Sequence, residues 1–136
     1  GKVYQAGTLS ANPLAMVGGL STLKEMTPET YQFIEEQTKK IVALFTNWMH
    51  TFDGGRFSMF KVVHYSSLFW IVPKTDVTKL SDIPSNLTEN FNKLFEVLLD
   101  RGIYLAPNAY EVGFVSAAHT DEVIRDLEHR LEHRIQ

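Results

Sequence analysis

The sequence contains no cysteine among its 136 residues, which excludes a scaffold built on disulfides. It also lacks a block of basic residues. With 13 Lys and Arg against 16 Asp and Glu, the net charge is −3, and this mildly acidic balance gives no indication of nucleic-acid binding. No apolar run approaches the roughly 18 residues that a membrane-spanning helix needs. These absences predict a soluble, cytoplasmic protein that contacts neither nucleic acid nor membrane.

What the sequence does contain is typical of a folded domain. Apolar residues make up 44% and charged residues 21% of the chain, as in ordinary globular proteins. A chain of this size buries roughly two-thirds of its unfolded surface, enough for one core. Because the first residue is Gly1 rather than methionine, we expect the chain to be a piece of a longer polypeptide.

Apolar spacing predicts four helices. Asn12 and Pro13 begin the first, which runs to Met26, and its Gly18-Gly19 pair predicts a close approach of another segment. Thr27 caps the second, and Gly54-Gly55 ends it. The second helix has a regular apolar seam, formed by Tyr31, Ile34, Thr38, Ile41, Phe45, Trp48 and Phe52.

The two later helices follow similar rules. Asn86 and Glu89 predict a capping box for the third, and Gly102 a C-terminal cap. Thr120 caps the fourth. The predicted buried residues are Phe91, Leu94, Phe95, Leu98 and Leu99 in the third helix, and Ile124, Leu127, Leu131 and Ile135 in the fourth.

Segments rich in β-branched and aromatic residues predict strands. Residues 57–63 and 68–72 read as an antiparallel pair joined by a turn at 64–67, and residues 103–105 and 114–115 as shorter strands. Residues 74–85 are polar and read as a loop. The predicted fold class is therefore α+β, a small antiparallel β-sheet packed against helices.

Two segments, residues 4–13 and 105–120, suggest chemistry rather than packing. In the first, residues 4–13, Gly7 and Thr8 precede a helix N-terminus. A glycine that lets the backbone approach, a hydroxyl, free N–H groups and the positive end of the helix dipole together suit a phosphate. The alternative is an ordinary loop before a well-capped helix.

The second segment, together with the first, carries a family resemblance. Residues 3–16 (VYQAGTLSANPLAM), 101–107 (RGIYLAP) and 110–120 (YEVGFVSAAHT) are similar, in order and spacing, to motifs of the glutamate-1-semialdehyde 2,1-aminomutases. That family belongs to the class III aminotransferases, which use pyridoxal 5'-phosphate on the type I fold. The resemblance implies that this chain is the C-terminal part, with residues 1–26 an interdomain segment and phosphate loop, and 27–136 the small domain.

The resemblance also implies site residues. Gly7 and Thr8 match the residues that reach the cofactor phosphate of the other subunit in a homodimer. Glu111 matches a carboxylate at the substrate end of the pocket, where it could hold an amino group; its alternative is a solvent-facing loop acid. The lysine that forms the Schiff base lies upstream in the family, within an N-terminal large domain, so the isolated chain is expected to be inactive.

The implied activity is an isomerisation that moves an amino group between neighbouring carbons, giving 5-aminolevulinate for tetrapyrrole synthesis. The implied partners are the large domain, a second subunit and a small amino-acid substrate. Two departures from the family pattern stand out, Ala11 in place of glycine and the stretch 61–70. The alternatives are another class III aminotransferase and a freestanding, non-catalytic dimerisation module.

Other candidate residues have simpler interpretations. His129 and His133 are spaced to make a metal pair, but their charged neighbours favour a solvated face, and no metal is expected. His119 is interpreted as structural, fixing the loop before Thr120, and Trp48 and Trp70 as parts of the core.

Overall fold

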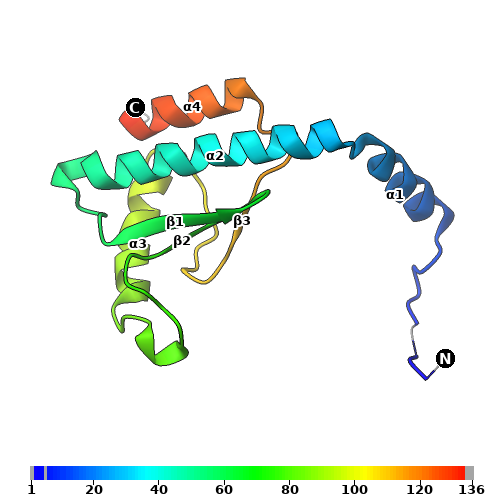
Figure 1. Cartoon of the computed structure of the whole chain (residues 1–136), viewed down its shortest axis with the longest axis horizontal. Helices are drawn as coiled ribbons and strands as arrows, with labels where there is room; N and C mark the ends of the chain where they lie inside the picture. The colour runs from blue at the N-terminus through cyan, green and yellow to red at the C-terminus, as the bar shows by residue number, and fades with distance from the viewer. Residues whose placement is uncertain (1, 5, 134–136) are drawn as a thin grey trace.

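The computed structural model describes residues 2–4 and 6–133, and it consists of a helix that projects from a compact body. The projecting helix is α1 (Pro13–Glu25), as Figure 1 shows. In the body, helix α2 (Pro28–Thr51) lies between a small sheet and helix α4 (Asp121–Glu132), while helix α3 (Leu87–Leu99) crosses one end of the sheet. The predicted α+β class is confirmed.

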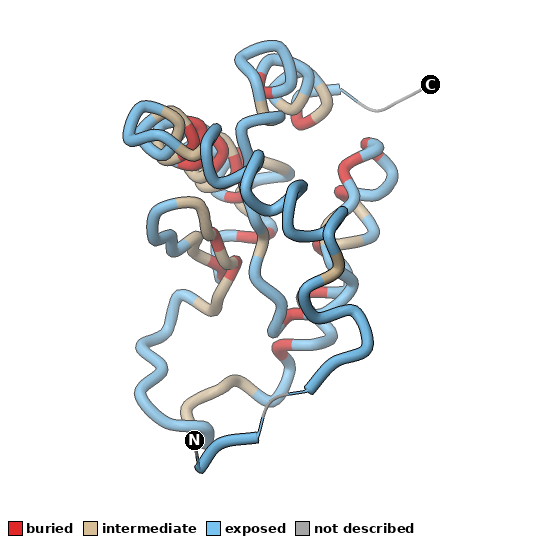
Figure 2. Tube along the Cα trace, turned by 90° about the vertical axis from the view of Figure 1, so that its right-hand side faces the viewer, coloured by how far each residue is buried: buried red, intermediate tan, exposed pale blue. Residues whose placement is uncertain are grey.

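Helix α1 begins as the sequence predicts, with the Asn12 side chain accepting hydrogen bonds from Leu14 N at 3.0 Å and Ala15 N at 3.3 Å. None of its residues is buried, and Figure 2 shows this part of the chain exposed while buried residues gather in the body. Around Gly18 and Gly19 nothing lies within 4 Å of an added Cβ. The close approach predicted there is therefore not made by the described part of this chain.

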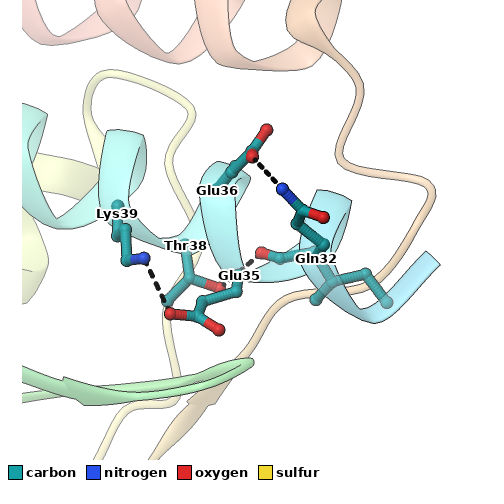
Figure 3. Close-up of polar contacts among 6 residues, drawn as sticks. Gln32, Glu35, Glu36, Thr38 and Lys39 are labelled. Atoms are coloured by element: carbon teal, nitrogen blue, oxygen red, sulfur yellow. Dashed lines mark hydrogen bonds and ion pairs between the residues drawn. The ribbon is translucent and has the colours of Figure 1, made fainter. Parts of the chain in front are cut away.

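Helix α2 carries most of the core. Its buried residues are Ile34, Gln37, Thr38, Ile41, Phe45, Trp48 and Met49. The prediction for Tyr31 is wrong, because this side chain, in the first turn of the helix, is 53% exposed. The polar Thr38 fits the seam because its hydroxyl donates to Ile34 O at 2.9 Å (Figure 3).

On either side of that seam, polar pairs one turn apart line the surface of α2. Lys39 Nζ lies 2.7 Å from Glu35 Oε1, and Gln32 Nε2 donates to Glu36 Oε1 at 3.2 Å (Figure 3). The helix gives way to a 3-10 turn, η1 (Phe52–Gly54), followed by Gly55. Positive φ angles at Asp53, Gly54 and Gly55 turn the chain toward the sheet, so the predicted Gly-Gly stop is confirmed.

The sheet has the order β1-β2-β3 and is antiparallel throughout: β1 (Phe60–Tyr65), β2 (Leu68–Pro73) and β3 (Gly113–Phe114). Tyr65 pairs with Leu68, so the hairpin loop is two residues long, and Ser66 has a φ of 50° as such tight loops require. The predicted strand at 57–63 starts too early, because residues 57–59 form a turn in which Phe60 N donates to Phe57 O.

The predicted strand at 103–105 is wrong. Those residues lie in an irregular segment after α3. The third strand is Gly113–Phe114, which pairs with Leu68 and Phe69, and Val115 N extends the pairing to Ser67 O at 2.8 Å.

Helix α3 is confirmed, but the predicted capping box is wrong. The Asn86 side chain makes no capping hydrogen bond, and Glu89 instead binds Lys93 Nζ at 2.6 Å, one turn along. Leu99, predicted to be buried, is 47% exposed. Gly102, with a φ of 69°, ends the helix as predicted, its N–H donating to Leu99 O at 2.8 Å. The buried residues are Leu87, Phe91, Leu94 and Leu98.

Helix α4 packs on α2 through a buried apolar face and one polar contact. Ile124 and Leu131 are buried and Leu127 is partly buried, whereas Ile135 lies outside the described residues. Thr120 precedes the helix without a capping bond from its side chain. Asp121 Oδ1 accepts from Lys40 Nζ at 2.7 Å and Gln37 Nε2 at 2.9 Å. Neither the two donors nor the acceptor could be identified from helical spacing.

This contact makes a pH-dependent prediction. The hydrogen bond from Lys40, then that from Gln37, lowers the pKa of the Asp121 carboxyl below its ordinary 3.8. A lowered pKa gives stabilisation that is present above the ordinary value and lost as the pH falls through the lowered one. In urea titrations between about pH 5 and pH 2, the wild-type free energy of unfolding should fall more steeply than that of Asp121→Asn.

The matched control is Asp126→Asn, because the ion pair that Asp126 makes with Arg130 lies within α4. That variant should follow the wild-type slope more closely than Asp121→Asn does. Parallel acid limbs for wild type and Asp121→Asn would contradict the prediction.

Across the described residues, no helix combines the length and apolar character needed to cross a membrane.

Candidate functional site

The first predicted site is the loop ahead of α1. Ser10 N donates to Gly7 O at 3.0 Å, and a Cβ added to Gly7 would lie 2.7 Å from Ser10 Oγ. A side chain at position 7 would therefore need the Ser10 hydroxyl to rotate away. Thr8 is exposed, and its hydroxyl has no hydrogen-bond partner among residues 2–4 and 6–133.

One part of the anion-site hypothesis needs correction. The N–H groups of Leu14 and Ala15 are taken by the Asn12 side chain, and that of Met16 by Asn12 O. A phosphate at this place would therefore be held by the loop that contains Gly7 and Thr8, because the N–H groups of the first helical turn already donate to Asn12.

Ala11, which the resemblance places at a position where the family usually has glycine, has a φ of 60°. This left-handed conformation costs a residue with a Cβ on the order of 1 kcal/mol relative to glycine. The substitution therefore keeps the loop conformation but adds backbone strain beside the phosphate loop.

The second predicted site is the loop between α3 and β3. The Asn108 side chain accepts from Tyr110 N at 3.0 Å, and Glu111 N donates to Asn108 O at 3.1 Å. The turn presents Glu111 as an exposed carboxylate. It also borders a small cavity of about 40 Å³, whose other lining residues are Phe69, Ile71, Phe91, Leu105, Ala106, Val112 and Gly113.

Two neighbouring residues of β2 fix this loop on either side of Glu111. Two positions after Glu111, a Cβ added to Gly113 would overlap the Phe69 ring, so the backbone of β3 lies directly on that ring. Two positions before Glu111, Ala109 O accepts a hydrogen bond of 2.9 Å from Trp70 Nε1. Residue pattern alone did not reveal either contact.

The structure does not bring the two predicted sites together within this chain. Figure 1 shows the N-terminal loop and α1 projecting away from the body that carries Glu111. Gly7 and Thr8 are among the exposed residues of the projecting segment. Such a separation is compatible with a loop that serves another subunit, which is the arrangement that the resemblance implies.

His119 has the structural role expected of it. Its Nδ1 accepts a hydrogen bond from Ser116 N at 3.0 Å, and its own N–H donates to Ser116 O at 3.0 Å. These bonds close the turn that leads from β3 to α4.

A cavity of about 450 Å³ lies between α2, α4 and residues 102–106. It contains none of the predicted cofactor or substrate residues. His119 and the Asp126–Arg130 ion pair lie at it, among mainly apolar side chains.

Sequence reasoning missed one buried cation. Arg101, in the RGIYLAP motif, is only 6% exposed. Its guanidinium lies 4.7 Å from the ring centre of Phe52 and 5.7 Å from that of Trp48, and it donates to Val97 O. A charged residue directly after an apolar helix face was the available signal. Through these contacts Arg101 connects α2 to α3.

The described lysines of α2 and α3 do not resemble a catalytic lysine. Lys39, Lys40 and Lys93 are exposed and paired with carboxylates at 2.6–2.7 Å, whereas an activated lysine is desolvated or lies beside a cation. The rings of His129 and His133 are 4.7 Å apart. Among residues 2–4 and 6–133, no group of three or more His, Cys, Asp or Glu could hold a metal.

Comparison with known proteins confirms the resemblance. No protein-family model matches the chain. It is 46% identical over 127 residues to glutamate-1-semialdehyde 2,1-aminomutase of Bdellovibrio bacteriovorus, and 44% identical over 128 residues to the enzyme of the same name in Leptospira interrogans. Each alignment covers 91% of this chain but only 29% and 28% of the relative. The chain thus spans less than a third of these relatives and corresponds to their C-terminal part.

Solved structures agree on the fold. An omega-transaminase from Sphaerobacter thermophilus matches with a TM-score of 0.74 at 22% identity, covering 95% of this chain and 29% of its own. A transaminase with PLP bound matches with a TM-score of 0.69 at 20% identity, covering 95% and 28%. The small sheet and its helices therefore have the fold of a part of the transaminases.

Proposed function

We propose that this chain is the C-terminal part of a pyridoxal-phosphate-dependent glutamate-1-semialdehyde 2,1-aminomutase. The observation that carries the proposal is the 46% identity to an enzyme of that name over 91% of the chain. The complete protein would be a cytoplasmic homodimer, an isomerase that forms 5-aminolevulinate for tetrapyrrole synthesis. In it, residues 1–26 connect the domains and carry the phosphate loop, and residues 27–136 are the small domain.

In this proposal Gly7 and Thr8 bind the cofactor phosphate of the other subunit. The turn at Gly7, closed by Ser10 N on Gly7 O, and the exposed Thr8 fit such a group. The loop donates hydrogen bonds through N–H and O–H groups, which suits an acceptor-rich dianion. When bound, pyridoxal phosphate supplies the electron sink for the reaction. The loop itself contributes binding of the phosphate and orientation of the cofactor.

Glu111 is the substrate-side residue of the proposal. Its exposed carboxylate, at the rim of a small cavity, is placed to accept hydrogen bonds from an ammonium group. The carboxylate favours the ammonium form of an amino group bound in this way. It also orients that group relative to the neighbouring carbon. The loop 106–112 would therefore decide which end of a two-carbon amine unit is presented.

The second candidate is a class III aminotransferase, which the transaminase neighbours favour. The two activities differ in their need for a second substrate, because aminomutation requires no external amino acceptor. The complete gene product that contains this chain should convert glutamate-1-semialdehyde to 5-aminolevulinate in the absence of any added keto acid. Turnover only after a keto acid is added would overturn the proposal in favour of an aminotransferase.

The isolated chain should not bind the cofactor covalently. We expect no absorbance in the visible band of the cofactor after incubation with pyridoxal phosphate. The resemblance places the Schiff-base lysine upstream of this chain, and the lysines that the chain does contain are exposed or, at Lys61, half-buried beside Asp76. Borohydride reduction followed by peptide mass spectrometry checks this result. Stoichiometric labelling of one lysine would contradict it and would support an autonomous module.

A further inference from the structure

The strand β2 carries one tryptophan whose polar atom reaches outside the sheet. Alternation along the strand places Phe69 and Ile71 on one face, where both are buried, and Trp70 on the other. From there the indole Nε1 donates to Ala109 O at 2.9 Å, across 39 positions of sequence. Ala109 is itself only 4% exposed, so this bond holds a buried point of an otherwise exposed loop.

That buried point lies next to the proposed substrate-binding residue. Glu111 follows Ala109 by two positions and precedes Gly113 by two. Gly113 rests on the ring of Phe69 and pairs with its backbone. Two consecutive residues of β2 therefore fix the loop on both sides of Glu111, one through a hydrogen bond and the other through a ring contact.

We propose that Trp70 is a positioning residue, whose indole N–H holds the loop 106–112 so that the Glu111 carboxylate faces the substrate amino group. This inference rests on the proposed role of Glu111.

The indole N–H matters to the loop because Ala109 O is a buried acceptor that needs a hydrogen-bond donor. Without the indole N–H, Ala109 O must find water, and the turn opens to admit it. The carboxylate two residues further on then samples more positions, which lowers the fraction of bound substrate in the reactive geometry. Loss of one such hydrogen bond corresponds to a change of about tenfold in these populations.

The test uses the complete enzyme with Trp70→Phe, which keeps an aromatic ring and removes the donor. Hydrogen exchange of peptides covering residues 106–112 should accelerate about tenfold, and kcat should fall about tenfold with a smaller change in KM. The matched control is Trp48→Phe. In the described chain the Trp48 Nε1 atom has no hydrogen-bond partner, so the same substitution there removes ring packing but no hydrogen bond. It should change the exchange of residues 106–112 and kcat far less than Trp70→Phe does.

A double-mutant cycle separates positioning from general stability. In a Glu111→Gln background, Trp70→Phe should lower kcat far less than it does in the wild type, because the residue through which it acts has lost its charge. Equal losses in both backgrounds, or unchanged exchange in residues 106–112, would overturn the proposal. The cycle is measured on whichever amino transfer the enzyme catalyses, so failure of the aminomutase assignment would leave this test decisive.

Discussion

Replacing Gly113 by alanine should lower the free energy of unfolding by about 2–3 kcal/mol, a large share of the stability of a domain this size. A Cβ at this position would overlap the Phe69 ring, with even the farther Cε2 atom only 2.9 Å away. Phe69 cannot easily yield, because it is 8% exposed and stacks on Phe45 with 6.0 Å between ring centres. The strain must therefore move the backbone of β3, and with it Glu111. Urea titration followed by circular dichroism measures the loss.

The chain offers a matched control for that substitution. Gly18→Ala makes the same chemical change in α1, where nothing lies within 4 Å of the added Cβ, and it should increase local helix stability by about 0.5–1 kcal/mol. It should leave the unfolding midpoint of the body unchanged. Adding Phe69→Leu to Gly113→Ala should recover part of the lost stability by removing the obstructing ring. If Gly113→Ala unfolds at the wild-type urea concentration, the contact with Phe69 is not tight.

In the complete enzyme, Thr8→Ala should weaken cofactor binding by about 10- to 100-fold, the range for losing a hydrogen bond to a charged group. The reason is that the proposed acceptor is a phosphate dianion and the helix N–H groups cannot compensate, since Asn12 already occupies them. Titration of apoenzyme with pyridoxal phosphate, followed by its absorbance, gives the affinity. Ser10→Ala is the control, because the neighbouring hydroxyl is equally small and exposed.

The proposed action across the subunit interface has a sharper consequence. Thr8→Ala subunits mixed with subunits that lack the upstream lysine should form hybrid dimers, each with one intact site. Activity should then recover toward a quarter of the wild-type value on random pairing. If Thr8 serves its own subunit instead, every site in the hybrid is defective and no recovery is expected.

Helical periodicity predicted the parts of this fold that depend on local chemistry. The seam of α2 places Ile34, Ile41 and Phe45 in the core, as their spacing requires. The errors occur where a non-local partner decides the outcome. Residues 103–105 have strand composition, but β2 pairs with Gly113–Phe114 instead, and no local signal distinguishes the two segments. Glu89 has the spacing of a capping residue and also lies one turn from Lys93, and the ion pair prevails.

The residues of the candidate site likewise divide into those that the sequence identifies and those that only the folded chain identifies. Gly7, Thr8 and Glu111 could be selected only through long motifs, because each residue alone has an ordinary interpretation as part of a surface loop. The supports of Glu111 could not be selected at all, since Trp70 and Ala109 are 39 positions apart and meet only in the folded chain. Gly113 was part of a motif, yet the reason for a glycine there is the ring of Phe69, which only the structure reveals.

The junction between α1 and α2 is short and internally bonded. Thr27 N and Thr30 Oγ1 both donate to Glu25 O, at 3.0 and 2.8 Å, and Met26 packs against the core. These hydrogen bonds and the packing of Met26 set the direction in which α1 leaves α2, and with it the place that the loop before α1 can reach.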